Sequence, residues 1–183
     1  MTVGGPDMRQ RWKAAFGDER VEAPFSFQYG DQSSSEVLAR SKRTSTHKKI
    51  DAQRSGHTIT YVDPKTGLEV RWEGVEYRDF QTVEWTVYLK NTGTADTPIL
   101  SNIQGLDVNL KRAMGKEFKL YYNRGDSCTA ISYEPMTREL GAGDAIGFAP
   151  TGGRGTNFEF PYYNLRSDSA GVIIAVGWPG QWA

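Results

Sequence analysis

The side chains best suited to metal binding or nucleophilic catalysis are few in this chain. Its 183 residues include two histidines, His47 and His57, and one cysteine, Cys128. Zinc sites combine several histidines and cysteines at short, regular spacing, and these three residues do not have that spacing. No Gly-x-Ser-x-Gly sequence marks a nucleophilic serine, so a Ser-His-Asp triad is not favoured. The sequence therefore predicts no metal, no cofactor and no catalytic residue.

Two further stretches have the composition of an anion site without its pattern. Residues 152–155 read Gly-Gly-Arg-Gly, but neither a Lys-Ser/Thr pair nor a helical pattern follows them. We interpret this stretch as a wide turn between strands. Lysines and arginines gather within residues 42–49, and such runs are most often solvated faces rather than anion sites.

Carboxylates could support a different chemistry, the cleavage of a glycosidic bond, which needs two of them facing each other. Because charged residues are common at strand edges, sequence alone assigns none of them to such a pair. The candidates are Asp79, Glu84, Asp107, Asp126 and Glu134.

Aromatic residues offer a binding surface instead. An apolar run, Val172 to Val176, predicts a fully buried strand, and Trp178 and Trp182 follow it beside Pro179-Gly180. Exposed indoles suit sugar stacking or a protein contact. The alternative is that both indoles fold back into the core. The candidate contact residues are Trp178, Trp182, Arg154, Asn164 and Tyr162.

The elements that would position these residues are mostly strands. Apolar and polar residues alternate over 68–73 and 83–90, which is the period of a strand with one buried face. A Pro- and Gly-containing turn at 63–67 predicts a hairpin over 57–76, and strands at 118–122 and 129–133 predict another. These signals indicate an all-β fold, an antiparallel β-sandwich. The predicted core includes Val83, Trp85, Val87, Leu89, Val172, Ile174 and Val176.

Helix is expected only near the N-terminus. Residues 7–16 have a helical apolar face and end at Gly17, a typical C-cap. The polar segment 30–55 is predicted to be a long surface excursion with a short strand near Val37-Leu38. We therefore expect an N-terminal extension over 1–23 with a short helix, followed by a single sandwich domain over 24–183.

Composition excludes several classes of partner. Lys plus Arg and Asp plus Glu both number 22, giving a formal net charge of zero. Bulk charge therefore supports neither nucleic-acid nor membrane-surface binding. One cysteine excludes an internal disulfide, and no apolar stretch reaches the roughly 18 residues of a membrane span. The first 20 residues lack the apolar segment of a signal peptide, which makes the cytoplasm the expected location.

Three sequence blocks stand out together, namely residues 63–70 with 77–80 and 83–85, residues 90–93 with 96–100 and 106–107, and residues 152–154 with 161–165 and 171–182. They resemble the N-terminal β-sandwich of α-galactosidases of the melibiase kind, which are glycoside hydrolases of family 36 and its relatives. Together the blocks span about residues 24–183, and their order and spacing carry the resemblance. The third block departs from the family pattern, with Gly155-Thr156 in place of Ser-Ser and Tyr162-Tyr163 in place of Phe-Phe.

The resemblance implies a sandwich of the supersandwich type and a role without catalysis. In such enzymes the catalytic aspartates lie in a following (β/α)8 barrel of about 250 residues, which this chain cannot encode. The expected partner is therefore a catalytic barrel in cis or in trans, or a second copy of the chain, with carbohydrate as a further ligand. The alternative is a stand-alone carbohydrate-binding or interaction module. A third, weaker interpretation is an enzyme that uses carboxylates on the sandwich itself.

Overall fold

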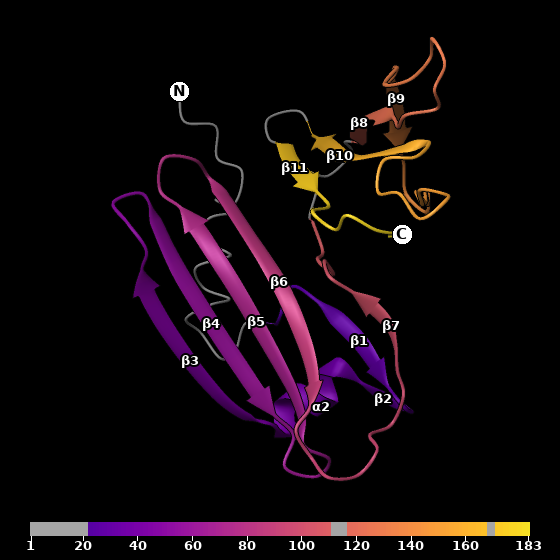
Figure 1. Cartoon of the computed structure of the whole chain (residues 1–183). Coiled ribbons are helices and arrows are strands. Elements are labelled where there is room, and N and C mark those ends of the chain that lie inside the picture. Colours follow the sequence, from indigo (N-terminus) through magenta and orange to yellow (C-terminus); the bar gives the residue numbers. More distant parts are fainter. Residues whose placement is uncertain (1–21, 111–116, 168–170) are drawn as a thin grey trace. The chain divides into compact units, whose positions relative to one another are not determined.

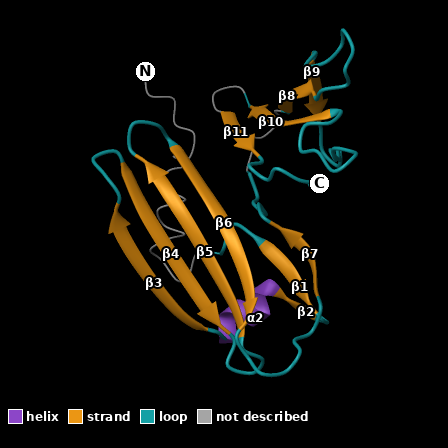
Figure 2. Ribbon diagram, viewed as in Figure 1, coloured by secondary structure: helices purple, strands orange, loops and turns teal. Residues whose placement is uncertain are grey.

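The computed structural model describes residues 22–110, 117–167 and 171–183 (Figure 1). The described part divides into two compact units, a first over residues 22–109 and a second from residue 110 onward. The described residues form eleven strands and one helix, and every pairing between neighbouring strands is antiparallel (Figure 2). The predicted all-β, sandwich-like fold class is confirmed. The helix expected over 7–16 lies outside the described residues, and the single domain over 24–183 stays a prediction.

The first unit contains a four-stranded meander. Its strand order is β3-β4-β5-β6, with β3 (Lys42–Lys49), β4 (Arg54–Val62), β5 (Leu68–Tyr77) and β6 (Thr82–Asn91). The predicted hairpin is present as β4 and β5, joined by the turn at 63–67, where Gly67 adopts a φ of 76°. Burial alternates strictly along β5, so the period-two pattern correctly identified its buried face.

A smaller sheet and a helix cover that buried face. The sheet has the order β2-β1-β7, formed by β2 (Gln32–Ser33), β1 (Ser26–Tyr29) and β7 (Leu100–Gln104), and the helix is α2 (Ser34–Arg40). Their apolar side chains meet those of β4 and β5 in one buried core. The four side chains of β6 that we predicted to be in the core pack against it but are only half-buried. They are Val83, Trp85, Val87 and Leu89. The core residues are Phe25, Phe27, Tyr29, Val37, Ile59, Leu68, Val70 and Trp72.

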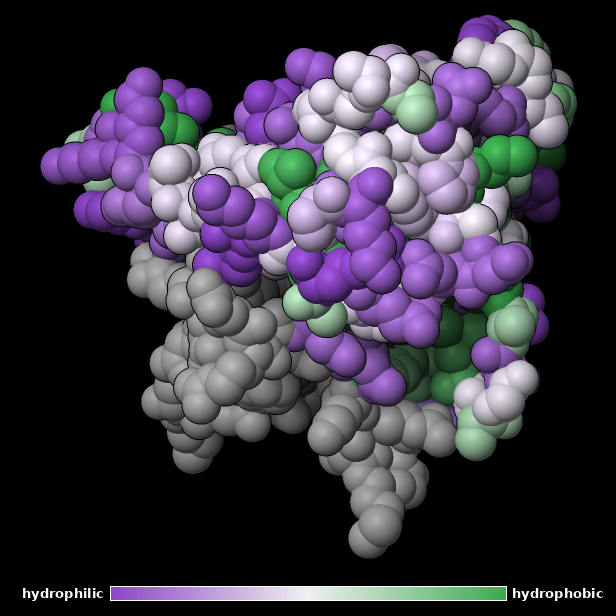
Figure 3. Space-filling view, turned by 90° about the horizontal axis from the view of Figure 1, so that it is seen from below, coloured by the Kyte–Doolittle hydropathy of each residue, from purple (hydrophilic) through white to green (hydrophobic). Residues whose placement is uncertain are grey.

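The prediction for residues 30–55 was wrong. Residues 34–40 form α2, where we expected a loop with a short strand, and residues 42–49 form β3. A capping box fixes the start of α2, because the Ser33 hydroxyl and the Glu36 carboxylate each accept from the backbone N–H of the other residue. The end of the unit that carries α2 presents mainly hydrophilic side chains (Figure 3).

The second unit is one four-stranded sheet. Its order is β11-β10-β8-β9, with β11 (Gly171–Ala175), β10 (Glu159–Arg166), β8 (Phe118–Arg124) and β9 (Pro135–Leu140). Two predictions fail here. The partner of β8 is residues 135–140 and not 129–133, which form a turn in which Tyr133 has a φ of 63°. Turn geometry therefore prevails over the β-prone composition of that segment.

The second failure concerns the apolar run at 172–176. It forms an edge strand, β11, rather than a fully buried one. Ile173 is 71% exposed, whereas Val172, Ile174 and Val176 are half-buried. An apolar run cannot by itself distinguish a strand covered on both faces from one covered on a single face.

None of the helices among the described residues is long and apolar enough to cross a membrane.

Candidate binding surface

The pairing of β10 with its neighbours defines the two faces of the second sheet. Tyr163 lies opposite Tyr122 of β8 and Ile174 of β11, so these side chains share one face. We call this the packed face. The intervening residues of the same strands, among them Tyr162 and Ile173, point to the other side, which we call the open face.

On the packed face four aromatic rings contact one another in sequence. The ring centroids of Tyr122 and Phe148 are 5.0 Å apart, those of Phe148 and Tyr163 are 4.7 Å apart, and those of Tyr163 and Trp182 are 6.2 Å apart. Burial, and after it the charge of Glu159, raises the pKa of the Tyr163 phenol. This face is therefore filled by its own aromatic side chains.

The C-terminal segment folds back onto the loop at 151–157. The indole N–H of Trp182 donates to the Gly155 carbonyl at 2.9 Å, and the Gln181 amide donates to the Pro150 carbonyl. A Cβ built on Gly155 would lie 3.1 Å from the carbonyl oxygen of Trp178. Glycine at position 155 thus permits a close approach that a larger residue would obstruct.

Within that loop Arg154 has a local partner. Its guanidinium donates to the side-chain oxygen of Asn157 at 2.8 Å, and the Asn157 amide donates to both oxygens of Thr151. Asn157 is buried. Arg154 therefore holds the loop in shape, and the glycine-rich stretch forms turns in which Gly152 and Gly153 have positive φ.

The open face carries exposed aromatic side chains. The Phe160 and Tyr162 rings are stacked at 5.4 Å with an interplanar angle of 25°, and Tyr133 meets Phe160 edge-on at 5.8 Å. Tyr133 is 51% exposed and Tyr162 is 53% exposed. Asn164 lies two residues beyond Tyr162 on the same face and pairs with Ile173 across the sheet. The open face thus combines these aromatic side chains and Ile173 with polar ones, among them Lys119, Glu139 and Arg166.

The five predicted contact residues consequently fall into two groups. Trp178 and Trp182 lie at the loop that contains Arg154, and Trp178 is 65% exposed while Trp182 is half-buried. Tyr162 and Asn164 lie on the open face, on the side of the sheet opposite Tyr163. Sequence reasoning missed Tyr133 as a neighbour of the Phe160 ring, because it belongs to a turn where a strand over 129–133 was expected.

Four of the five candidate carboxylates are engaged in local contacts. Glu84 accepts a hydrogen bond from the Tyr77 hydroxyl, Asp107 from Ser26, and Glu134 from Arg124.

Asp126 accepts hydrogen bonds from the Cys128 backbone N–H and the Ser132 hydroxyl, which lower the pKa of its carboxyl group. These contacts explain the acidic residues as turn and strand-end supports. Among the described residues no group of three or more metal-ligating side chains gathers.

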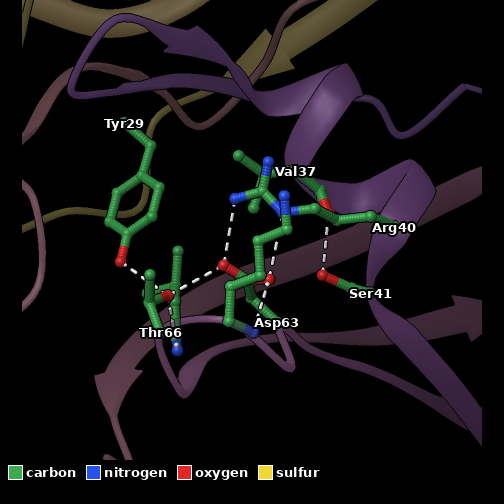
Figure 4. A network of polar contacts seen from close by, with 8 residues as sticks. Tyr29, Val37, Arg40, Ser41, Asp63 and Thr66 are labelled. Atoms are coloured by element: carbon green, nitrogen blue, oxygen red, sulfur yellow. Dashed lines mark hydrogen bonds and ion pairs between the residues drawn. The ribbon is translucent and has the colours of Figure 1, made fainter.

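One polar arrangement in the first unit was not foreseen. The Asp63 side chain is completely buried and makes a bidentate ion pair with Arg40, both N–O distances being 3.0 Å (Figure 4). Thr66 donates to Asp63 and accepts from the Tyr29 hydroxyl. These contacts, led by the hydrogen bonds from Arg40, lower the pKa of Asp63 to about 2. The network joins α2, the β4–β5 turn and β1, so its role is to fix the sandwich.

The two histidines also come together. His47 and His57 are directly opposite on β3 and β4, with ring centroids 4.8 Å apart. The Nε2 atom of His57 lies 3.9 Å from a carboxylate oxygen of Glu76. Their pairing depends on strand register, which the sequence alone does not specify.

No protein-family model, curated protein or solved structure matched this chain.

Proposed function

We propose that the chain is a non-catalytic β-sandwich module of an α-galactosidase-like glycoside hydrolase. In this role it packs against a catalytic barrel or a partner subunit and shapes sugar access. The observation that carries the proposal is the exposed surface of the second unit, where Tyr133, Tyr162, Ile173 and Trp178 are each more than half exposed. The sequence resemblance supplies the kind of partner.

The energy of covering this surface is large enough to hold a partner. An aromatic side chain offers roughly 150–250 Å² of buriable area. Covering the exposed half of one such ring, roughly 100 Å², is worth about 2–3 kcal/mol. The free energy gained by covering several rings together exceeds the cost of ordering their side chains, which is about 0.5–1.5 kcal/mol each. The proposal gives the chain no catalytic residue, in keeping with the local engagement of the candidate carboxylates.

A stand-alone carbohydrate-binding module is the second candidate, and one observation favours it. The stacked rings of Tyr162, which is exposed, and Phe160, which is half-buried, form an aromatic platform of the kind on which a sugar ring can lie. Asn164, on the same face, would supply a polar contact to a hydroxyl group. In this case the ligand of the open face is a sugar rather than a protein.

The gene beyond codon 183 provides the first test. We expect an in-frame barrel of about 250 residues. In the longer protein, Trp178→Ala and Tyr162→Ala should lower the melting temperature of the barrel. The matched control is Phe80→Ala, because Phe80 is 69% exposed but belongs to the first unit.

Assays on the isolated chain separate the alternatives. We expect no hydrolysis of aryl α-galactosides, and turnover abolished by one Asp or Glu substitution would refute the proposal. Saturable binding of an α-galactoside in calorimetry, lost in Tyr162→Ala, together with the absence of any barrel, would favour the carbohydrate-binding module instead.

A further inference from the structure

The two edges of the first sheet are built differently. At one edge, four of the eight residues of β3 are Lys or Arg, and such cations discourage pairing with another strand. At the other edge, β6 is ten residues long and has only two charged residues, Glu84 and Lys90. Among the described residues, β6 pairs only with β5. A long edge strand with so few charges is a template for a further strand.

The sequence of β6 is complementary to itself. In an antiparallel pair of two copies centred on Val87, residues whose numbers sum to 174 lie opposite each other. Glu84 then faces Lys90 of the second copy on the exposed side, and the same contact recurs across the two-fold axis. On the core side Trp85 faces Leu89.

Neighbouring registers lack this match. A shift of two residues in either direction keeps each face on its own side but places Glu84 opposite Tyr88 or Thr92. Both ion pairs are then lost, and Lys90 faces Thr82 or Thr86 instead. Opposite charges directly across a ladder stabilise it. The two charged residues of β6 thus select one register out of those compatible with its alternation.

We infer that β6 is a self-association edge, through which two copies of this chain join their four-stranded sheets into one continuous antiparallel sheet. The side chains that would face each other across the new pair on the exposed side of β6 are accessible. These are Thr82, Glu84, Thr86, Tyr88 and Lys90, which are all exposed. Glu84 is also held in place by the Tyr77 hydroxyl at 2.8 Å. The inference does not depend on the proposed function, since it concerns the first unit and needs no barrel or sugar.

Charge reversal in the full chain tests the register. Sedimentation equilibrium should show a dimer for the unaltered chain. E84K and K90E should each raise the dimer dissociation constant by about tenfold or more, because each replaces two attractive pairs by two repulsive ones. An equimolar mixture of E84K and K90E should dimerise again, since each introduced side chain then faces one of opposite charge on the other variant.

Matched variants guard against general effects of charge. Lys48→Glu on β3 and Asp31→Lys in the exposed turn after β1 should leave the dissociation constant unchanged. Lys90 also lies opposite Glu69 within its own chain, so the melting temperature of K90E is measured alongside. A chain that stays monomeric, a dimer indifferent to both reversals, or a mixture no tighter than its components would each overturn the inference.

Cross-linking gives a second measurement that needs no charge change. In a Cys128→Ser background, Thr86→Cys should be joined rapidly to its counterpart by a short bis-maleimide. The two residues lie on the exposed side next to the proposed axis, about 7 Å apart as diagonal neighbours. Thr46→Cys on β3 is the control and should not cross-link. Equal cross-linking of the two variants would contradict the β6 contact.

Discussion

The two units of this protein are stabilised in different ways. In the first unit eight large apolar side chains are buried together, and the Asp63–Arg40 ion pair fixes the helix against them. In the second unit only two apolar side chains among the described residues, Leu120 and Pro150, are buried to this degree. Aromatic ring contacts and tight turns hold the second sheet instead. The first unit therefore has a filled apolar core, whereas the second leaves large apolar side chains such as Ile173 and Trp178 exposed.

This difference indicates where each unit should be sensitive to substitution. A residue in a filled core is costly to shorten, because the surrounding side chains cannot collapse into the space. A unit held by turns and ring contacts should instead be sensitive to changes in its backbone. The predictions below follow that division, from the largest expected effect to the smallest.

Trp72→Ala should have the largest effect. Trp72 is 1% exposed and meets Phe25 edge-on at 5.9 Å. Emptying such a site costs about 3–5 kcal/mol of unfolding free energy. Urea unfolding followed by far-UV circular dichroism measures it. Trp178→Ala is the matched control and should cost less than about 1 kcal/mol, because that side chain is mainly exposed. Equal losses for the two variants would remove the contrast between the units.

Gly125→Ala should be the most damaging small substitution in the second unit. A Cβ at this position would collide with the Thr156 carbonyl and the Glu159 backbone. The backbone there is fixed by hydrogen bonds from Gly125 to Phe158 and from Asp126 to Thr156. Overpacking of this kind costs about 3 kcal/mol.

Hydrogen exchange can locate that damage. Protection should fall in β8 and β10 and stay unchanged in β4 and β5. Gly143→Ala is the comparison, since a Cβ there meets nothing within 4 Å, although its φ of 84° adds some strain. A loss of protection spread over both units would show that they unfold together.

Asp63→Asn should change the pH dependence of the first unit. The folded pKa of Asp63 is lowered from 3.8 to about 2. Because the pKa is lower in the folded state, the stabilisation is fully present at pH values above the pKa of the unfolded state. It is lost as the pH falls through the pKa of the folded state. The shift corresponds to about 2 kcal/mol, lost between about pH 4 and pH 2.

The measurement is the unfolding free energy at pH 5 and at pH 2.5. The difference between the two should be smaller for Asp63→Asn than for the unaltered chain. Asp51→Asn is the control, because Asp51 is an exposed turn carboxylate whose pKa is also lowered, chiefly by the Gln53 backbone N–H. An identical pH dependence with and without Asp63 would show that the buried ion pair contributes nothing.

Sequence patterns were informative where burial on one face governs the strand. The alternation over 68–73 identified β5, and the Pro- and Gly-containing turn at 63–67 identified its hairpin partner. The patterns failed where short local contacts decide the structure. A capping box between Ser33 and Glu36 was visible in the sequence and would have identified α2. Residues 129–133 have a strand-like composition but belong to a turn.

The candidate surface was predictable only in part. The position of Trp178 beside Pro179-Gly180 indicated an exposed indole, and Tyr162 was singled out for its aromatic neighbours. The sequence could not assign Tyr162 and Trp182 to different sides of the second sheet, because that depends on the bulge in β10. The His47–His57 contact and the Asp63 network likewise depend on register and on which helix covers the turn.

The smallest expected effect concerns the two C-terminal indoles and sharpens the comparison within the second unit. Trp178→Phe should leave stability within about 0.5 kcal/mol of the unaltered chain, because a mainly exposed side chain is replaced. It should nevertheless remove a component of tryptophan fluorescence that acrylamide quenches readily. Trp182→Phe should leave that component in place, since Trp182 is half-buried, donates to the Gly155 carbonyl and packs edge-on against Tyr163. If the readily quenched component survives in Trp178→Phe, Trp178 is covered within the chain and the surface available to a partner is confined to the open face.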